Sequence, residues 1–206
     1  MTSVARTERA ALADLFDEVG PGAPTLCGDW LTRDLAAHLV LRERRPDAVP
    51  GIVASAFAGY TRSVQDRLAA GSWPKLVDKV RHRSPLLIGS MDDLVNTTEF
   101  FVHHEDVRRA AEGWQPRPYD ERLEQAMWRV VRSRGRAFFR KATLGVALAL
   151  PDGTTHVANN GTPSVTISGP ASELVLYSFG RKDHALVEIT GDEGDVETFS
   201  STPLAV

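Results

Sequence analysis

Cysteine and long apolar runs are both scarce in this sequence of 206 residues. A single cysteine, Cys27, excludes an internal disulfide, a Cys-x-x-Cys redox pair and a thiolate-rich zinc site. No stretch approaches the roughly 18 uninterrupted apolar residues of a transmembrane helix. The first residues also lack the apolar run of a signal peptide. We therefore expect a soluble, cytoplasmic protein that does not enter a membrane.

Lysine is scarce as well, because 20 of the 24 basic residues are arginine. With 27 acidic residues the net charge is −3, which argues against general nucleic-acid binding. The charges are unevenly spread along the chain. Residues 1–140 carry 21 basic and 19 acidic side chains, whereas residues 141–206 carry 3 and 8. This change of sign indicates two domains.

Hydrophobic periodicity predicts helices over the first 141 residues, because apolar residues recur there every three or four positions. The predicted helices cover 4–19, 32–45, 47–70, a short segment from 72, 90–111 and 120–140. In the segment 47–70, Phe57 and Tyr60 are among the residues expected to face inward.

The period changes after residue 141, where β-branched and apolar residues indicate strands at 143–150, 154–158, 164–168 and 186–189. The turn signal at 151–153 predicts a hairpin between the first two strands, and a short helix is expected at 171–179. Helices followed by strands predict a mainly α protein, with an α bundle at 1–141 and a small α+β domain at 142–206.

Glu99 and His103 are the residues most suggestive of chemistry. On a helix they stand at i and i+4, so their side chains project from the same face. Val95, Phe100 and Val107 lie near that face, which indicates that it points into the bundle. A carboxylate and an imidazole in an apolar interior are costly unless something pairs them. A divalent metal is one such partner, and a hydrogen bond between the two side chains is the other.

His38 favours the metal, because it lies on the inward face of the second predicted helix. A four-helix core would bring it against Glu99 and His103. Two imidazoles and one carboxylate leave open coordination positions, as in catalytic zinc and non-haem iron sites. Two aspartates lie one helical turn from these histidines: Asp106 follows His103, and Asp34 precedes His38. Each is either an outer acceptor that fixes the tautomer of the neighbouring ring or a solvated side chain.

Two segments of the sequence resemble a known family. Residues 26–39, LCGDWLTRDLAAHL, resemble the signature of DinB-like metal-binding bundles. The E-x3-H-x2-D segment from Glu99 to Asp106 resembles the second signature of their actinobacterial branch, related to mycothiol-dependent maleylpyruvate isomerase. Residues 164–192 are similar to the small sterol-carrier-like domain of that branch. The resemblance implies a DinB-like four-helix bundle followed by a small α+β, sterol-carrier-like C-terminal domain.

The resemblance also implies that His38, Glu99 and His103 hold a divalent metal, with zinc as the expected ion. In such bundles the metal faces a cleft where a low-molecular-weight thiol such as mycothiol binds as thiolate. Arg181 matches an arginine that reaches towards this cleft in the isomerase-like members. It is therefore the candidate catalytic residue, with the role of holding a carboxylate.

Three functions remain as alternatives from the sequence. The first is a metal-dependent enzyme that uses mycothiol, as an S-transferase or isomerase, and acts on a small-molecule electrophile or acid. The second is a non-catalytic metal or small-ligand binding module, whose sterol-carrier-like domain holds an apolar ligand or contributes to a homodimer. In the third, Glu99 and His103 are only hydrogen-bonded in the core.

Two further features receive structural interpretations. Cys27 is interpreted as a small turn or core residue rather than a reactive thiol. A stripe of arginines on the predicted helix 120–140 is interpreted as a solvated face rather than an anion-binding surface. Its members are Arg122, Arg129, Arg132, Arg136 and Arg140.

Overall fold

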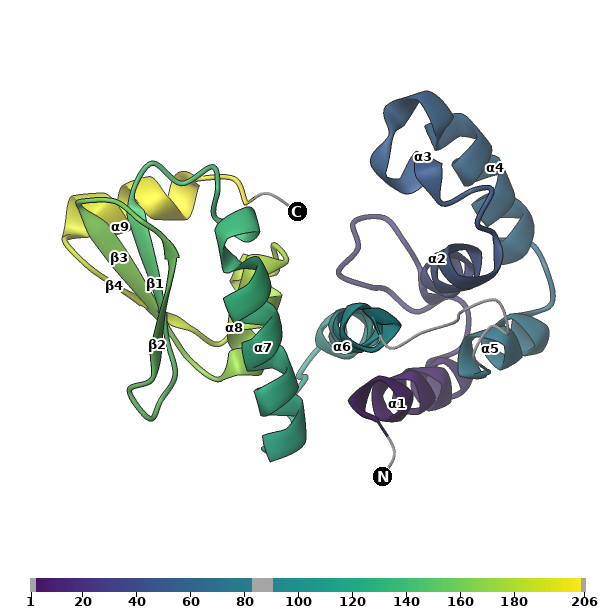
Figure 1. The fold of residues 1–206 in the computed structure, drawn as a ribbon. Helices are drawn as coiled ribbons and strands as arrows, with labels where there is room; N and C mark the ends of the chain where they lie inside the picture. The colour runs from purple at the N-terminus through teal and green to yellow at the C-terminus, as the bar shows by residue number, and fades with distance from the viewer. Residues whose placement is uncertain (1–2, 83–90, 205–206) are drawn as a thin grey trace. The chain divides into compact units, whose positions relative to one another are not determined.

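The computed structural model describes residues 3–82 and 91–204, and the chain divides into two compact units. The first, here called the helical unit, comprises residues 1–116, and the second, the sheet unit, comprises residues 117–206 (Figure 1). Among the described residues, no helix is long and apolar enough to cross a membrane.

Helices form the regular structure of the helical unit. They are α1 (Val4–Val19), α2 (Thr32–Arg44), α3 (Pro50–Val53), the 3-10 helix η1 (Ser55–Phe57), α4 (Ala58–Ala69), α5 (Trp73–Arg81) and α6 (Met91–Arg109). Most bounds lie close to the predicted ones, and the predicted start of the fifth segment at residue 90 lies outside the described residues.

The predicted continuous helix over 47–70 is wrong, because this segment is divided into α3, η1 and α4. The chain turns sharply enough that a Cβ on Gly51 would overlap the hydroxyl of Thr61 and the carbonyl of Phe57. Only glycine permits this close approach of α3 to α4. The turn leaves Phe57 and Tyr60 exposed by 57% and 46%, so they do not face inward as predicted.

One hydrophobic core is shared by α1, α2, α5 and α6, which Figure 1 shows grouped together in the helical unit. Each helix contributes large buried side chains, such as Phe16 from α1, Leu39 from α2, Val77 from α5 and Phe100 from α6. Burying a side chain of this size contributes about 1.5–3 kcal/mol. The predicted helical bundle is thus confirmed.

A buried ion pair links the four helices of this core. Arg9 on α1 donates to both carboxylate oxygens of Glu43 on α2. It also donates to the carbonyl of Val80 on α5 at 2.9 Å. Its guanidinium carbon lies 4.1 Å from the ring centroid of Phe100 on α6. A single arginine side chain therefore contacts all four helices.

The sheet unit combines helices with a four-stranded mixed sheet. Its elements are α7 (Glu121–Phe138), β1 (Gly145–Ala149), β2 (Thr155–Asn159), β3 (Ser164–Ser168), α8 (Ala171–Ser178), η2 (Lys182–His184), β4 (Glu188–Thr190) and α9 (Glu193–Ser201). The strand order is β2-β1-β3-β4, with β1 antiparallel to β2 and parallel to β3, and β3 antiparallel to β4. This confirms the predicted mainly α protein with a small α+β part.

Helix α7 belongs to the sheet unit, whereas the predicted boundary after residue 141 places it in the first domain. It packs on α8 and β2. The ring of Phe138 lies 4.9 Å from that of Phe179, and a Cβ on Gly135 would come within 3.0 Å of the Cβ of Ala158. The apolar face of α7 is therefore buried by the sheet unit itself, which moves the division to residues 116 and 117.

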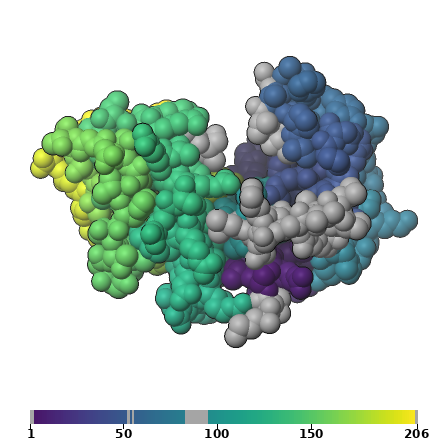
Figure 2. All heavy atoms as spheres, viewed as in Figure 1, coloured from purple at the N-terminus to yellow at the C-terminus, as the bar shows by residue number. Residues whose placement is uncertain are grey.

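Four arginines of the stripe lie on the opposite side of α7, and Arg140 follows the end of this helix. Part of α7 is visible in teal-green in Figure 2. All five members are exposed: Arg122, Arg129, Arg132, Arg136 and Arg140. This exposure agrees with the interpretation of the stripe as a solvated face.

Replacing Glu43 by alanine should lower the free energy of unfolding by about 3–5 kcal/mol, because the buried guanidinium of Arg9 would lose its counter-charge. The double variant Arg9→Met with Glu43→Leu removes both charges and should lose much less. Urea unfolding followed by circular dichroism measures both values. Equal losses in the single and double variants would show that the ion pair does not cause the effect.

Candidate metal centre

The loop between α1 and α2 is fixed to α6 by backbone and side-chain hydrogen bonds. The N–H of Leu26 donates to the carbonyl of Asp106 at 3.0 Å. The hydroxyl of Thr25 donates to the carbonyl of Trp30 at 2.7 Å and accepts from the N–H of Cys27 at 3.1 Å. These bonds hold Cys27 and Trp30 beside the polar face of α6.

His38, Glu99 and His103 lie together, the first on α2 and the other two on α6. Nε2 of His38 is 3.2 Å from Oε1 of Glu99, and Nε2 of His103 is 3.3 Å from the same oxygen. Their side chains are 12%, 22% and 13% exposed. One ligand atom from each lies within 4.8 Å of the others, so the structure brings the three predicted ligands together.

The spacing of these atoms suits a tetrahedral ion. Zinc bonds to nitrogen and carboxylate oxygen of about 2.0–2.1 Å place neighbouring ligand atoms about 3.3 Å apart in a tetrahedron. The separations of 3.2 and 3.3 Å match that value. The 3.2 Å separation between His38 and Glu99 is also a hydrogen bond, which pairs these side chains when no ion is bound. The residues present therefore fit a divalent ion.

The other ring nitrogen of His103 is held by a carboxylate. Nδ1 lies 2.9 Å from Oδ2 of Asp106, whose side chain is fully buried. Because a carboxylate only accepts, Nδ1 donates to it, and the neutral ring then presents a lone pair at Nε2. That lone pair faces Oε1 of Glu99, which is also an acceptor. Two acceptors in this position require a proton or a cation between them.

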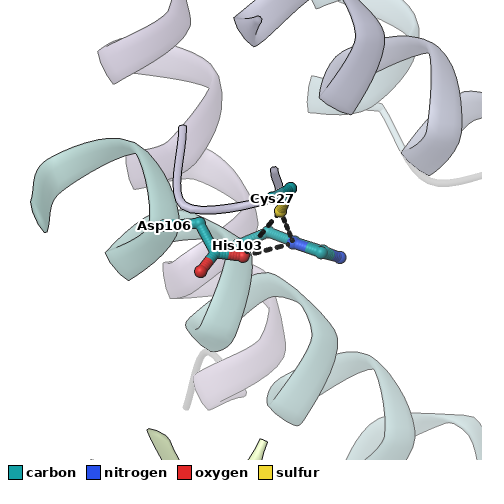
Figure 3. A group of neighbouring side chains, drawn as sticks. All are labelled: Cys27, His103 and Asp106. Atoms are coloured by element: carbon teal, nitrogen blue, oxygen red, sulfur yellow. Dashed lines mark hydrogen bonds and ion pairs between the residues drawn. The ribbon is translucent and has the colours of Figure 1, made fainter. Parts of the chain in front are cut away.

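Cys27 contacts the side of His103 that faces Asp106, and Figure 3 shows these three side chains together. Its Sγ donates to Oδ2 of Asp106 at 3.0 Å and lies 3.7 Å from Nδ1 of His103. Cys27, His103 and Asp106 form a second group that could hold a metal. This group uses Nδ1, whereas the first group uses Nε2. In this group Sγ of Cys27 and Nδ1 of His103 both donate to Oδ2 of Asp106, at 3.0 and 2.9 Å. These hydrogen bonds form without an ion.

Charges in the centre shift two pKa values in opposite directions. Burial alone would raise the pKa of Glu99, but the hydrogen bonds from His103 and His38 outweigh it and hold the pKa well below its usual range. Burial alone would lower the pKa of His103. Hydrogen bonds with Asp106, Cys27 and Glu99 outweigh that effect and raise the pKa well above its usual range.

Arg42 places a fixed positive charge beside the same carboxylate. It lies one turn after His38 on α2, and its Nε is 3.6 Å from Oε1 of Glu99. Its Nη1 donates to Oδ1 of Asn96 at 2.8 Å.

The sequence analysis missed Arg42 and the contacts of Cys27 and Trp30. The spacing of Arg42 from His38 is the one signal that could have found any of these three.

Two other predicted polar residues have local partners. Asp34 accepts a hydrogen bond from the N–H of Leu31 at 3.0 Å, so it caps the start of α2. Arg181 lies in the sheet unit, where it is half-buried and its Nη1 donates to the carbonyl of Phe179 at 2.5 Å. Its role as a carboxylate binder stays a prediction.

The helices of the first unit, followed by the mixed sheet of the second, give the chain a DinB-like fold. Two crystal structures of mycothiol-dependent maleylpyruvate isomerase share it. One carries a histidine-to-alanine substitution and has a TM-score of 0.61 and 14% identity, covering 91% of this chain and 96% of that chain. The other has a TM-score of 0.56 and 16% identity, covering 92% and 96%. No protein-family model and no curated protein matches the sequence. At these identities the likeness shows the fold.

The two pKa shifts predict how the metal-free protein responds to pH. The lowered pKa of Glu99 stabilises the fold above its unfolded value near 4.5, and this contribution is lost as the pH falls towards the native pKa. The raised pKa of His103 stabilises the fold below its unfolded value near 6.5, and this contribution is lost as the pH rises through the native pKa.

Thermal unfolding of chelator-treated protein across a pH series measures this dependence. We expect the unfolding temperature of the wild type to decline on both sides of an intermediate maximum. The Glu99→Gln variant should flatten both limbs, because it removes the acid that titrates and the charge that favours imidazolium. An unchanged profile in this variant would exclude the coupling.

Proposed function

We propose that the helical unit holds one divalent metal ion, zinc being the favoured one, on His38, Glu99 and His103. The observation that carries the proposal is the convergence of one ligand atom each from His38, Glu99 and His103 within 4.8 Å of one another. Two imidazoles and one carboxylate are suitable ligands for zinc. Three protein ligands leave a position open, as in catalytic sites rather than structural ones.

The proposal extends to a low-molecular-weight thiol, with mycothiol as the candidate and S-transfer or isomerisation as the reaction. The fold shared with mycothiol-dependent maleylpyruvate isomerase supports it. When bound, the ion supplies positive charge that favours the deprotonated form of a thiol near neutral pH.

The side chains of this protein contribute by orientation. Asp106 keeps the proton of His103 at Nδ1, which directs the Nε2 lone pair to the centre. The ring of Trp30 lies 5.3 Å from that of His38 and limits its rotation.

Arg181 is retained as the proposed carboxylate binder. Replacing it by glutamine should weaken the use of an acidic substrate without lowering the metal content of the protein.

Protein purified without chelators should contain one zinc or similar ion per chain, measured by elemental analysis. His103→Ala should lose this ion, because it removes a ligand. His82→Ala is the matched control, since His82 is exposed at the end of α5 and should leave the content unchanged. Circular dichroism establishes that both variants are folded. Wild-type protein with no metal would refute the metal centre.

The substitutions His38→Ala and Cys27→Ser distinguish the two candidate groups. His38→Ala should abolish metal binding, whereas Cys27→Ser should largely preserve it, because serine can still donate to Asp106. Asp106→Asn should weaken zinc binding about 10- to 100-fold by releasing His103. Competition with a chromophoric chelator measures each affinity. Loss of the ion in Cys27→Ser but not in His38→Ala would place it in the group of Cys27, His103 and Asp106.

Thiol conjugation tests the enzymatic part of the proposal. Zinc-loaded protein should accelerate the reaction of mycothiol with a small electrophile, or the isomerisation of an unsaturated acid, and His38→Ala should not. Product formation is followed by chromatography with mass detection. A full metal complement without any acceleration would support the alternative of a non-catalytic binding module.

A further inference from the structure

Arg42 is held in a fixed orientation at the edge of the centre. It stands at i+4 from His38 on α2, so both side chains project from the same face of the helix. Asn96, at i−3 from Glu99 on α6, is buried and accepts from Nη1 of Arg42 at 2.8 Å. The guanidinium is therefore anchored by one nitrogen beside the carboxylate of Glu99.

The guanidinium keeps unused donors. Nε lies 3.6 Å from Oε1 of Glu99, an ion pair rather than a hydrogen bond. Among the side chains that the structure describes, which leave out those of residues 52, 53, 55 and 83–94, Nη2 has no hydrogen-bond acceptor. The Arg42 side chain is 17% exposed, so it is accessible to a small molecule. An arginine with free N–H groups in a fixed plane is suited to a carboxylate.

The charge balance of the centre also favours an anion. Among the described side chains of the centre, Glu99 and Asp106 supply two negative charges, whereas a divalent ion and Arg42 together would supply three positive ones. The two imidazoles are neutral when they coordinate. A partly buried site with one surplus positive charge binds an anionic ligand more readily than a neutral one. When an ion takes up the carboxylate of Glu99, Arg42 keeps its hydrogen bond to Asn96, and its charge is then less fully neutralised.

We infer that Arg42 selects an anionic ligand, its guanidinium binding the carboxylate of a small molecule that reaches the centre of His38, Glu99 and His103. This inference rests on the proposed metal centre. It assigns recognition of a carboxylate to a residue of the helical unit, one helical turn from a proposed ligand. It also names the ligand class as a small acid that carries a carboxylate, distinct from the thiol itself.

Two thiols that differ in charge test the inference on cobalt-loaded protein. The probes are 3-mercaptopropionate, which carries a carboxylate, and 2-mercaptoethanol, which does not. Changes in the visible absorption of cobalt give the dissociation constant of each probe at low ionic strength. The ratio of the two constants is compared between variants, so intrinsic differences between the probes cancel.

Arg42→Gln should reduce the preference for 3-mercaptopropionate by about 10- to 100-fold, because a hydrogen bond to a charged group is lost. The affinity for 2-mercaptoethanol should change little. Arg42→Lys should give an intermediate preference, since lysine keeps the charge but not the planar pair of donors. Arg62→Gln is the control, because Arg62 is exposed on α4, and it should match the wild type.

The metal affinity of Arg42→Gln is the second measurement. Loss of a neighbouring positive charge should leave cobalt binding as tight or tighter, whereas a residue that only positions Glu99 would weaken it. An unchanged ratio of probe affinities, or cobalt binding weakened tenfold or more, would overturn the inference. Wild-type protein that takes up no metal would instead refute the metal centre itself, so the two failures are distinguishable.

Discussion

The position of His103 between two carboxylates is the constraint on which the centre depends. Asp106 fixes one ring nitrogen as a donor, which leaves the other as an acceptor directed at Glu99. Without a cation these contacts favour a second proton on the ring, because hydrogen bonds with Asp106, Cys27 and Glu99 outweigh its burial and raise its pKa. A metal ion at the proposed site would compete with this proton for one position, so metal binding and the pH response of the fold would depend on the same side chains.

The surrounding helices hold His103, Glu99 and Asp106 in position relative to α2. The backbone bond from Leu26 to Asp106 joins the loop before α2 to α6, and it brings Cys27 to the carboxylate that orients His103. Deeper in the core, Arg9 contacts α1, α2, α5 and α6 through Glu43 and its other partners. The polar centre and the buried ion pair therefore both connect α2 to another helix, and a shift of α2 would break both.

The predicted helix bounds agree with the structure where a segment has a strong apolar repeat. They are wrong where contacts between helices, rather than the repeat, decide where a helix begins and ends. Helix α1 has the predicted bounds because its buried face recurs regularly. Residues 47–70 carry a similar pattern, yet the close approach at Gly51 divides them. Helix α9 was not predicted, since Phe199 is its one fully buried large side chain among the described residues and gives no repeat. The apolar face of α7 was recognised, but a repeat does not say which core buries it.

The sequence by itself determined the contacts that a single helix makes. The positions of Glu99, His103 and Asp106 follow from the helical period, which places residues three and four apart on one face. The tertiary structure decided the meeting of His38 with Glu99, of Cys27 with Asp106 and of Arg42 with Asn96. These pairs are separated by more than fifty residues, and their contact depends on how helices pack. No local spacing encodes that packing, so the centre became defined only when α2 and the loop before it were placed against α6.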